Sequence, residues 1–282
     1  MDIVDAQVHL NHLGPLESGL AAMNALGIAA LMFDEFGAMN DRGNFQPGEL
    51  LSSGVFRPTC PGAEAASIQH PDRIGVFRRV HYRDPELKKI ARSLADAPYA
   101  AVLRSALFGP DDMQALGRGE LNELIGIATD HDLPIAILAS GCAELLEPYA
   151  ERFPAAKILI DHCGAKLEPA GPTEVLEPVY RLARHPNMLL KWSNAAFFLS
   201  KEAYPFFDML SLLRRAVDSF GAERVLWGSD CTMNPNASWA EQLFSIRDAA
   251  EFSSEEKEWI LGRTARKHYR FPEDTSAAGA LN

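Results

Sequence analysis

Short apolar segments alternate with amphipathic segments along almost the whole chain. Eight of the apolar segments are rich in branched side chains, which is typical of buried strands, and they cover residues 3–8, 28–33, 74–81, 100–107, 134–139, 157–161, 188–193 and 224–228. The spacing of apolar residues between them predicts helices at residues 16–26, 85–95, 120–131, 174–184, 204–219 and 239–249. Strands that alternate with helices favour a parallel sheet, and eight of them predict one α/β domain, a (β/α)8 TIM barrel over residues 1–273.

Length, composition and charge restrict the class of partner. The chain of 282 residues lies in the size range in which an α/β barrel forms one domain. Hydrophobic residues make up 47% and charged residues 23%, and no run approaches the ~18 consecutive apolar residues of a membrane span. The formal net charge of −11 opposes binding to a phosphate backbone, which requires clustered Lys and Arg. We expect a small molecule as the partner, neither nucleic acid nor membrane, and leave a homo-oligomer open.

The connections depart from the regular pattern at one insertion and at the chain ends. Residues 34–69, after the second strand, are rich in Gly, Pro, Asn and Ser and show only weak periodicity. A connection of this length predicts a lid or substrate-binding insertion, with a disordered excursion as the alternative. Residues 274–282 are small and polar and predict a flexible C-terminal tail. The N-terminus carries neither a basic nor an apolar leader, which predicts a cytoplasmic protein.

The cysteines do not form a motif. Cys60, Cys142, Cys163 and Cys231 show no CxxC spacing, so we expect free thiols rather than a disulfide framework or a zinc knuckle. Cys163 and Cys231 each follow a candidate site residue directly. Because neighbouring side chains on a strand point to opposite faces, we do not expect either thiol to be a nucleophile.

Polar residues stand at the ends of three of the predicted strands. Gln7 and His9 end the first strand, His162 follows the sixth, and Asp230 follows the eighth. Active sites of (β/α)8 barrels lie at the carboxyl ends of the strands, so these side chains are expected to converge there. Alternation places Asp5 on the same face as Gln7 and His9, where it is either a site residue or a structural hydrogen-bond acceptor deeper in the barrel. The pattern predicts a hydrolytic site.

Four motifs resemble those of the amidohydrolase superfamily, in particular its amidohydrolase-2 branch. They are DxQxH at residues 5–9, LIDHCG at 159–164, LLKWSN at 189–194 and VLWGSD at 225–230, in the order of the family. The branch includes lactonases of 2-pyrone-4,6-dicarboxylate and of fuconolactone as well as aromatic-acid decarboxylases. The resemblance implies a barrel enzyme in which the eighth-strand Asp, here Asp230, is a metal ligand, a general base or both.

The sequence departs from the family at two metal-ligand positions. Gln7 stands where the family usually has the first His of HxH, and residues 134–139 lack the His that metal-dependent decarboxylases carry. An amide oxygen is a poorer ligand for zinc than an imidazole nitrogen. We therefore favour a site that requires no cofactor. If one divalent metal, Zn or Mn, is bound, its ligands are His9, His162 and Asp230.

The remaining groups suit hydrolysis without a metal. The resemblance implies that Asp230 takes a proton from water while His9 and His162 polarise a carbonyl. Burial at the mouth of an apolar barrel is expected to raise the pKa of Asp230 and make it a stronger base. Gln7, Arg104 and Lys191 are the expected substrate-binding residues. Arg104 and Lys191 could instead form surface or interstrand ion pairs, and Asp230 could instead cap the helix that follows it.

Further residues are weaker candidates. Arg78, Arg79 and His81 lie near the third strand, and one of the two arginines must face outward. Phe197, Phe198, Trp192 and Met233 are candidates for an apolar pocket wall or for core. The segment after LLKWSN lacks the extra Arg that dicarboxylate-hydrolysing members carry, which disfavours a doubly charged substrate.

We expect a hydrolase of the amidohydrolase-2 type that acts on a lactone or related ester of a small organic acid, with Asp230 activating water. The first alternative is a metal-dependent decarboxylase or hydratase of an aromatic or unsaturated acid, which requires a bound divalent ion. The second is a barrel that binds a small molecule without turnover.

Overall fold

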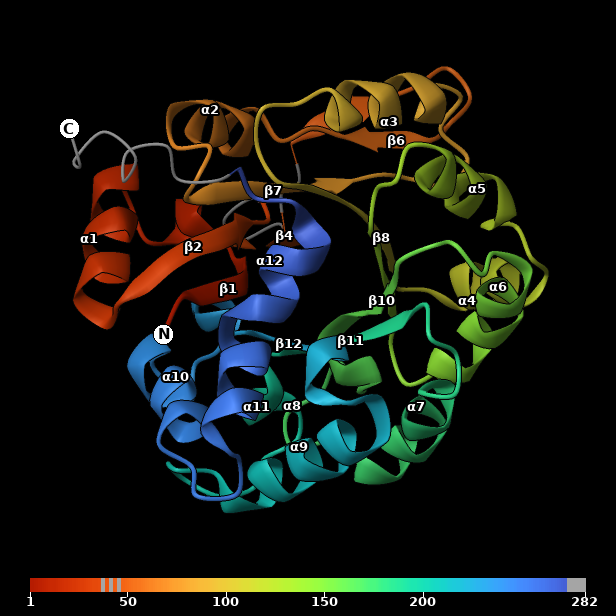
Figure 1. Cartoon of the computed structure of the whole chain (residues 1–282). Helices are drawn as coiled ribbons and strands as arrows, with labels where there is room; N and C mark the ends of the chain where they lie inside the picture. The colour runs from red at the N-terminus through yellow and green to blue at the C-terminus, as the bar shows by residue number, and fades with distance from the viewer. Residues whose placement is uncertain (37–38, 41–42, 45–46, 273–282) are drawn as a thin grey trace.

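Eight parallel strands form a closed barrel in the computed structural model, which describes residues 1–36, 39–40, 43–44 and 47–272 (Figure 1). In barrel order they are β1 (Ile3–Val8), β2 (Ile28–Phe33), β7 (Ile74–Arg79), β8 (Ala101–Leu107), β9 (Ile135–Ala139), β10 (Ile158–Ile160), β11 (Met188–Ser193) and β12 (Val225–Gly228). The ring closes where the Asp230 N–H donates to the Gln7 carbonyl over 2.9 Å. The predicted barrel is confirmed, and the eight strands lie where the sequence places them. The predicted tail, 274–282, lies outside the described residues.

Helices surround the barrel and cover one end. They are α1 (Leu16–Leu26), α2 (Pro61–Gln69), α3 (Leu87–Ala95), α4 (Pro110–Gly117), α5 (Asn122–Asp130), α6 (Glu147–Arg152), α7 (Leu176–Leu182), α8 (Ala195–Phe198), α9 (Phe207–Phe220), α10 (Trp239–Arg247), α11 (Ser254–Glu258) and α12 (Thr264–Tyr269). The six predicted helices correspond to α1, α3, α5, α7, α9 and α10. In Figure 1, α12 lies across the ring of strands. Within the described part of the chain, no helix has the length and apolar character to cross a bilayer.

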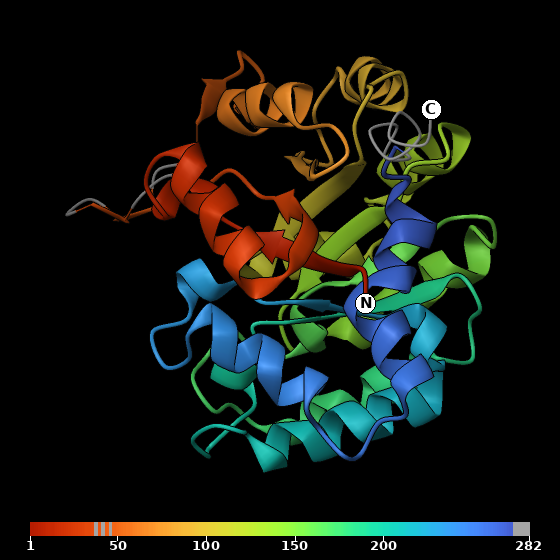
Figure 2. The ribbon, with the colours of Figure 1, turned by 60° about the vertical axis from the view of Figure 1, so that its left-hand side comes forward.

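The insertion after β2 contains secondary structure that its weak periodicity did not reveal. It holds two short hairpins, β3 (Met39–Asn40) with β4 (Gly43–Asn44) and β5 (Gly48–Leu50) with β6 (Phe56–Pro58), followed by α2. Pro61 starts α2, and Glu35 accepts the Ala63 N–H in its first turn over 2.9 Å. Figures 1 and 2 show α2, α3 and β6 gathered outside β7. The insertion is therefore a folded wall beside the barrel.

The barrel interior is apolar at one end and polar at the other. The apolar layer consists of Val4, Ala6, Ala30, Met32, Phe77, Val102, Ala136, Leu159, Leu189 and Leu226, which pack with Tyr269 of α12. Two residues further along their strands, on the same face, come the polar residues Asp34, Arg79, Arg104, Asp161 and Lys191. Tyr269 contacts Phe77 edge to face, with ring centroids 6.1 Å apart. The polar groups thus stand on an apolar floor, toward the carboxyl ends of the strands.

The position of Asp5 differs from our expectation. Val4 and Ala6 face the lumen, so the Asp5 carboxylate points outward, where it accepts the Trp239 Nε1–H over 2.7 Å and the Ser229 N–H over 2.8 Å. A register shift in the β1–β2 pairing between Asp5 and Val8 accompanies the turn of Gln7 into the lumen. Burial raises the pKa of Asp5 to about 6. Asp5 therefore joins β1 to β12 and α10 and is not a site residue.

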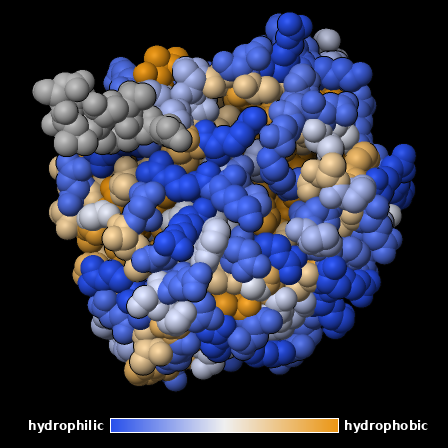
Figure 3. All heavy atoms as spheres, viewed as in Figure 1, coloured by the Kyte–Doolittle hydropathy of each residue, from blue (hydrophilic) through white to orange (hydrophobic). Residues whose placement is uncertain are grey.

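The face on which α12 lies is mainly hydrophilic among its described residues (Figure 3). Hydrophobic side chains occur there singly or in small groups, as is normal for a protein surface. The homo-oligomer stays a prediction.

Candidate active site

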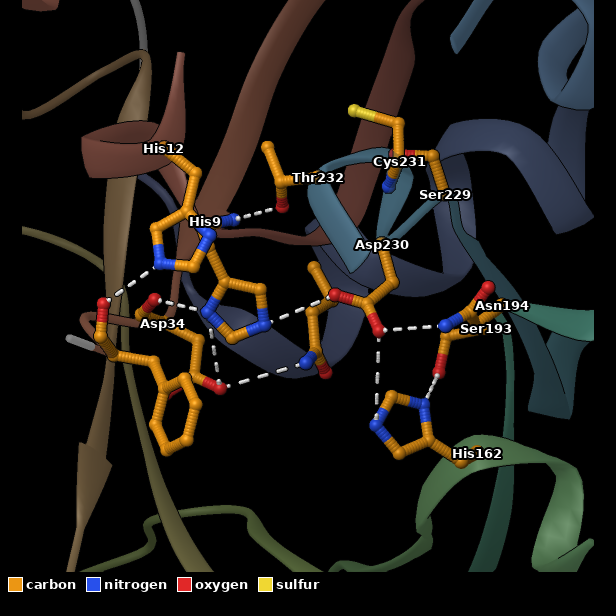
Figure 4. Close-up of polar contacts among 12 residues, drawn as sticks. His9, His12, Asp34, His162, Ser193, Asn194, Ser229, Asp230, Cys231 and Thr232 are labelled. Atoms are coloured by element: carbon orange, nitrogen blue, oxygen red, sulfur yellow. Dashed lines mark hydrogen bonds and ion pairs between the residues drawn. The ribbon is translucent and has the colours of Figure 1, made fainter. Parts of the chain in front are cut away.

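Three of the side chains singled out in the sequence meet at the carboxyl end of the barrel (Figure 4). His9 Nε2 lies 3.0 Å from Asp230 Oδ1, and His162 Nε2 lies 3.9 Å from Asp230 Oδ2. All three side chains are at least 93% buried. Asp230 therefore stands between the two imidazoles, and they line one cavity together with Gln7 and Asn194.

The backbone turns sharply at the ends of β10, β11 and β12. His162, Asn194 and Asp230 have φ values of 46°, 53° and 48°, in the left-handed region. This conformation costs a non-glycine residue about 1–2 kcal/mol, and Asn, Asp and His are the residue types found there most often. Each turn directs a polar side chain back over the barrel. Strain of this kind concentrates at functional sites.

Gly228 allows β1 and β12 to approach closely beside these turns. A Cβ atom at this position would lie 3.1 Å from the backbone nitrogen of Gln7 and 3.1 Å from the Ser193 Cβ. This approach brings the Asp230 N–H within reach of the Gln7 carbonyl. A side chain in place of the glycine of the VLWGSD segment would thus press on the closing strands of the barrel.

His9 is fixed by the start of the insertion. Its Nδ1 lies 2.7 Å from the Asp34 carbonyl oxygen, which can only accept, so Nδ1 carries a proton. Its Nε2 faces Asp230 Oδ1 as an ion-pair contact rather than an aligned hydrogen bond. The His9 ring and the Asp230 carboxylate are thus direct neighbours at the mouth of the barrel.

Arg104 determines the protonation state of His162. Arg104 Nη2 lies 3.1 Å from His162 Nε2, and because a guanidinium only donates, Nε2 must be the acceptor. His162 Nδ1 then donates to Ser193 Oγ over 2.8 Å. Burial lowers the pKa of His162 to about 4, so the ring is neutral at neutral pH. In this state His162 accepts a hydrogen bond at Nε2 and does not donate one there.

The pKa of Asp230 differs from the expected direction. Burial raises it, as anticipated, but the charge of His9 and its contact with the carboxylate, followed by His162 and Lys191, lower it more, so the pKa lies below 3.8. Asn194 Nδ2 also donates to Asp230 Oδ2 over 3.1 Å. The sequence predicted that Asp230 is buried, but it did not show which groups around Asp230 lower its pKa. Asp230 is ionised at neutral pH.

A buried network of charges lies beneath the three side chains. Asp161 contacts Arg104 Nε at 2.7 Å and Lys191 Nζ at 2.6 Å, and Arg104 also binds Asp34. Lys191 donates to Gln7 Oε1 and lies 4.5 Å from the centre of the Phe77 ring. Burial alone would raise the pKa values of Asp34 and Asp161, but Arg79 and Arg104 hold that of Asp34, and Arg104 and Lys191 hold that of Asp161, well below the ordinary range.

Lys191, which we expected to bind substrate, lies beneath the cavity rather than in its wall. Its side chain is fully buried, and burial lowers its pKa. Arg104 and Gln7 do line the cavity. The reason is depth: Lys191 belongs to the Asp161 layer, whereas Arg104 reaches up to His162.

The cavity at the mouth has a volume of about 320 Å³ and a largely apolar wall. Phe197, Phe198 and Met233 line it as expected, together with Phe36, Phe108, Leu138 and Leu167. Trp192 is instead buried on the outer side of the barrel, near Met209 and Ile246. Arg79 faces the cavity and binds Asp34 through Nε and Nη2, while Arg78 faces outward toward Glu64. As predicted, only one of these two arginines faces inward.

The thiols lie away from the reacting groups. In Figure 4 the Cys231 side chain points away from His9 and His162. Cys163 is fully buried, with its Sγ 3.7 Å from the Ser193 carbonyl oxygen. Burial raises the pKa of both thiols, so neither is a nucleophile at neutral pH.

Sequence reasoning missed three residues of the site: Asp34, Asp161 and Asn194. Asp34 and Asp161 stand at strand ends, two residues beyond a lumen residue, so the rule that identified Arg104 would also have found them. Asn194 follows β11 in the same place as His162 and Asp230 follow their strands. Asn194 lines the cavity, and its Oδ1 is buried without a hydrogen-bond partner among the described residues.

The residues at the mouth do not fit a divalent cation as they are placed. His162 Nε2, a necessary ligand atom, accepts a hydrogen bond from the Arg104 guanidinium, and Gln7 Oε1 accepts one from the Lys191 ammonium. A metal ion would stand beside these positive charges. Elsewhere among the described residues, Glu147, Glu151 and His185 place three potential ligand atoms within 4.8 Å of one another. Arg184 already pairs with Glu147 there.

Comparison with known proteins identifies the relatives of this chain. Over 143 residues it is 32% identical to the L-fucono-1,5-lactonase of Burkholderia ambifaria, a match that covers 49% of this chain and 48% of the lactonase. The chain thus spans about half the length of this curated relative.

Solved structures show the same fold over nearly the whole length. An amidohydrolase of Burkholderia multivorans with bound zinc matches with a TM-score of 0.70 at 16% identity, over 96% of this chain and all of that one. A putative 2-pyrone-4,6-dicarboxylic acid hydrolase of Pseudomonas putida matches with a TM-score of 0.68 at 18% identity, over 97% and 99% of the two chains. A family model described as amidohydrolase matches residues 5–271, and the chain therefore belongs to the amidohydrolase family.

Proposed function

We propose that the protein hydrolyses a lactone or related ester of a small organic acid, with Asp230 as the base that activates water. The observation that carries the proposal is the ionised, buried Asp230 carboxylate between His9 and His162 at the cavity wall. The partial match to a fucono-lactonase supports the choice of substrate class.

The reaction runs in two steps. Asp230 takes a proton from water as the water oxygen bonds to the carbonyl carbon and the carbonyl electron pair moves to its oxygen. When the carbonyl re-forms, the bond to the ring or ester oxygen breaks, and that oxygen takes the proton from Asp230. His9 faces the same carboxylate and stabilises its ionised form before the first step and after the second.

Arginines, rather than His162, stabilise the oxyanion in this proposal. The tautomer of His162 leaves Nε2 without a proton to donate. Arg104 and Arg79 both border the cavity, and each guanidinium has five N–H donors, of which Asp34, Asp161 and His162 engage only some. Preorganised cationic donors of this kind stabilise developing negative charge strongly in a site shielded from water. His162 is then the residue that positions Arg104.

Turnover of a panel of lactones, esters and aromatic acids tests the proposal. Hydrolysis of lactones or esters is expected, with release of one acid group per turnover measured by pH-stat titration. Decarboxylation or hydration of the acids would favour the lyase alternative. Saturable binding without turnover of any compound would favour the binding barrel.

Removal of metal is expected to leave activity unchanged. The proposed steps use only side chains of the protein, and Arg104 already donates to His162 Nε2, one of the ligand atoms that an ion would need. After dialysis against EDTA, with metal content followed by elemental analysis, kcat/KM for a lactone is expected to stay within about twofold. Loss of activity that Zn²⁺ or Mn²⁺ restores would contradict the proposal and favour the metal-dependent alternative.

The pH dependence of hydrolysis follows from two lowered pKa values. The pKa of His162 is about 4 and that of Asp230 lies below 3.8, so both groups are deprotonated above about pH 4. Because His162 must be neutral to accept the hydrogen bond from Arg104, kcat/KM is expected to rise as the pH increases through about 4 and to be level between pH 6 and 7. Circular dichroism at each pH separates this effect from acid unfolding. A rise of kcat/KM centred near pH 6.5 would contradict the proposal that His162 is neutral and Asp230 ionised at neutral pH.

A further inference from the structure

A second cavity adjoins the active-site cavity. It has a volume of about 240 Å³ and shares Phe36, Arg79, Arg104 and Phe108 with the first cavity. It lies between the ends of β7 and β8, the hairpin β5–β6 and the start of α4. A substrate whose carbonyl lies at Asp230 can therefore extend past Phe108 into this space.

Aromatic and aliphatic side chains form most of the second wall. The hairpin of the insertion contributes Phe56 and Pro58, and the strand ends contribute Val80, Tyr82 and Leu107. Phe108 is 66% exposed and Phe56 is 38% exposed, and both line this cavity. An apolar group that enters the cavity would cover these rings.

The shape and size of this space suit a ring. An apolar cavity of about 150 Å³ is enough to bind benzene, and this one is larger. The rings of Phe36, Phe56, Tyr82 and Phe108 line the cavity. Aromatic ligands contact such rings in stacked or edge-to-face arrangements. The Arg79 guanidinium lies over the Phe36 ring, 4.6 Å from its centre, at the junction of the two cavities.

The polar groups of the second cavity disfavour an anion. Asp112 lines it and accepts the Phe108 N–H over 3.2 Å, so its carboxylate is part of the wall. Arg79 is already paired with the Asp34 carboxylate. His81 accepts the Arg83 N–H at Nδ1, and burial lowers the pKa of its ring, so it adds no positive charge at neutral pH. The two arginines of this wall, Arg79 and Arg104, are shared with the first cavity and are paired with buried carboxylates, so a carboxylate placed beyond them in the second cavity would face Asp112.

We propose that the second cavity binds an uncharged aryl group of the substrate, so that the protein prefers aryl-substituted lactones or esters. This inference deepens the proposed hydrolysis and rests on it. The aryl group would lie between the hairpin β5–β6 and the end of β8, while the carbonyl lies at Asp230. The insertion after β2 thereby determines specificity.

A pair of lactones tests this assignment. δ-Valerolactone is compared with its counterpart that carries a phenyl ring on the carbon beside the ring oxygen. We expect kcat/KM to be at least about tenfold higher for the phenyl compound, because the ring buries apolar surface only in the second cavity. Equal values would overturn the proposal. An equal gain from a pentyl group in place of the phenyl ring would overturn the assignment to an aryl group.

Variants separate the two cavities. Ala106 of β8 lines the second cavity only, and Leu138 of β9 lines the first only. Ala106→Phe is expected to remove the tenfold preference and to leave δ-valerolactone within about twofold of the unsubstituted protein. Leu138→Phe, which adds the same ring at the other cavity, is expected to slow both lactones. If Ala106→Phe does not fold, Phe56→Ala on the exposed hairpin is expected to reduce the preference severalfold. A preference that survives either second-cavity substitution would overturn the proposal.

Binding distinguishes failure of this inference from failure of the proposed function. If no lactone or ester is hydrolysed, hydrolysis is refuted, and calorimetric titration with butyrate and 4-phenylbutyrate still tests the cavity. At least about tenfold tighter binding of 4-phenylbutyrate, lost in Ala106→Phe, would support the aryl site. Equal dissociation constants would overturn it.

Discussion

Replacement of Asp230 by asparagine is expected to lower kcat/KM for lactone hydrolysis by about 10³-fold. General base catalysis contributes 10²- to 10⁴-fold, and an amide cannot take the proton from water. The cavity and its cations would remain, because asparagine has nearly the shape of aspartate and tolerates the left-handed backbone at this position, where φ is 48°. Steady-state kinetics at pH 7, with thermal unfolding as a check on folding, measures the effect.

Asp132 provides a matched control for this substitution. It also has a left-handed backbone, with φ of 53°, but its side chain is 62% exposed and pairs with Lys157. Asp132→Asn is expected to leave kcat/KM unchanged. Activity of Asp230→Asn within tenfold of the unsubstituted protein would refute the role of Asp230 as base.

Replacement of Asp161 by asparagine is expected to lower the free energy of unfolding by about 3–5 kcal/mol. Asp161 is fully buried between Arg104 and Lys191, and loss of its charge leaves two cations in the lumen with one carboxylate fewer. Removal of one member of a buried ion network costs much more than loss of a surface pair, because the remaining charges are desolvated. Urea denaturation at pH 7 measures the difference.

The pH dependence of this loss has a definite sign. The pKa of Asp161 in the folded protein lies well below 3.8, so its ionised form adds stability that is complete above about pH 4 and declines as the pH falls below 3.8. The difference in free energy of unfolding between Asp161→Asn and the unsubstituted protein is therefore expected to be largest at pH 7 and to become smaller as the pH falls below 3.8.

Two comparisons make the stability prediction refutable. Asp132→Asn removes an exposed pair and is expected to change stability by less than about 1 kcal/mol. Combining Asp161→Asn with Lys191→Met removes a cation as well as the carboxylate, and the double variant is expected to be more stable than the sum of the single effects predicts. An unfolding midpoint for Asp161→Asn equal to that of Asp132→Asn would show that the network does not stabilise the fold.

The sequence alone determined the barrel and the order of its site residues. Strands such as 28–33 and 188–193 are long apolar runs between helical segments, and parallel strands that alternate with helices must bury both faces. Because all strand ends of a parallel barrel meet at one rim, the positions of His9, His162 and Asp230 in the sequence were enough to predict that they converge. This information is local and periodic, so it can be read from a single chain.

Only the tertiary structure decided which groups touch. Arg104 binds Asp34, 70 residues away, and Lys191 binds Gln7, 184 residues away, and no local pattern specifies such pairs. His9 lowers the pKa of Asp230, Arg104 sets the tautomer of His162, and the bonds of Lys191 to Asp161 and Gln7 place it below the cavity. A register shift of β1, not visible in the alternation of residue types, turned Asp5 outward. Charge and hydrogen bonding act through space, so their balance at a buried group depends on neighbours that folding alone brings together.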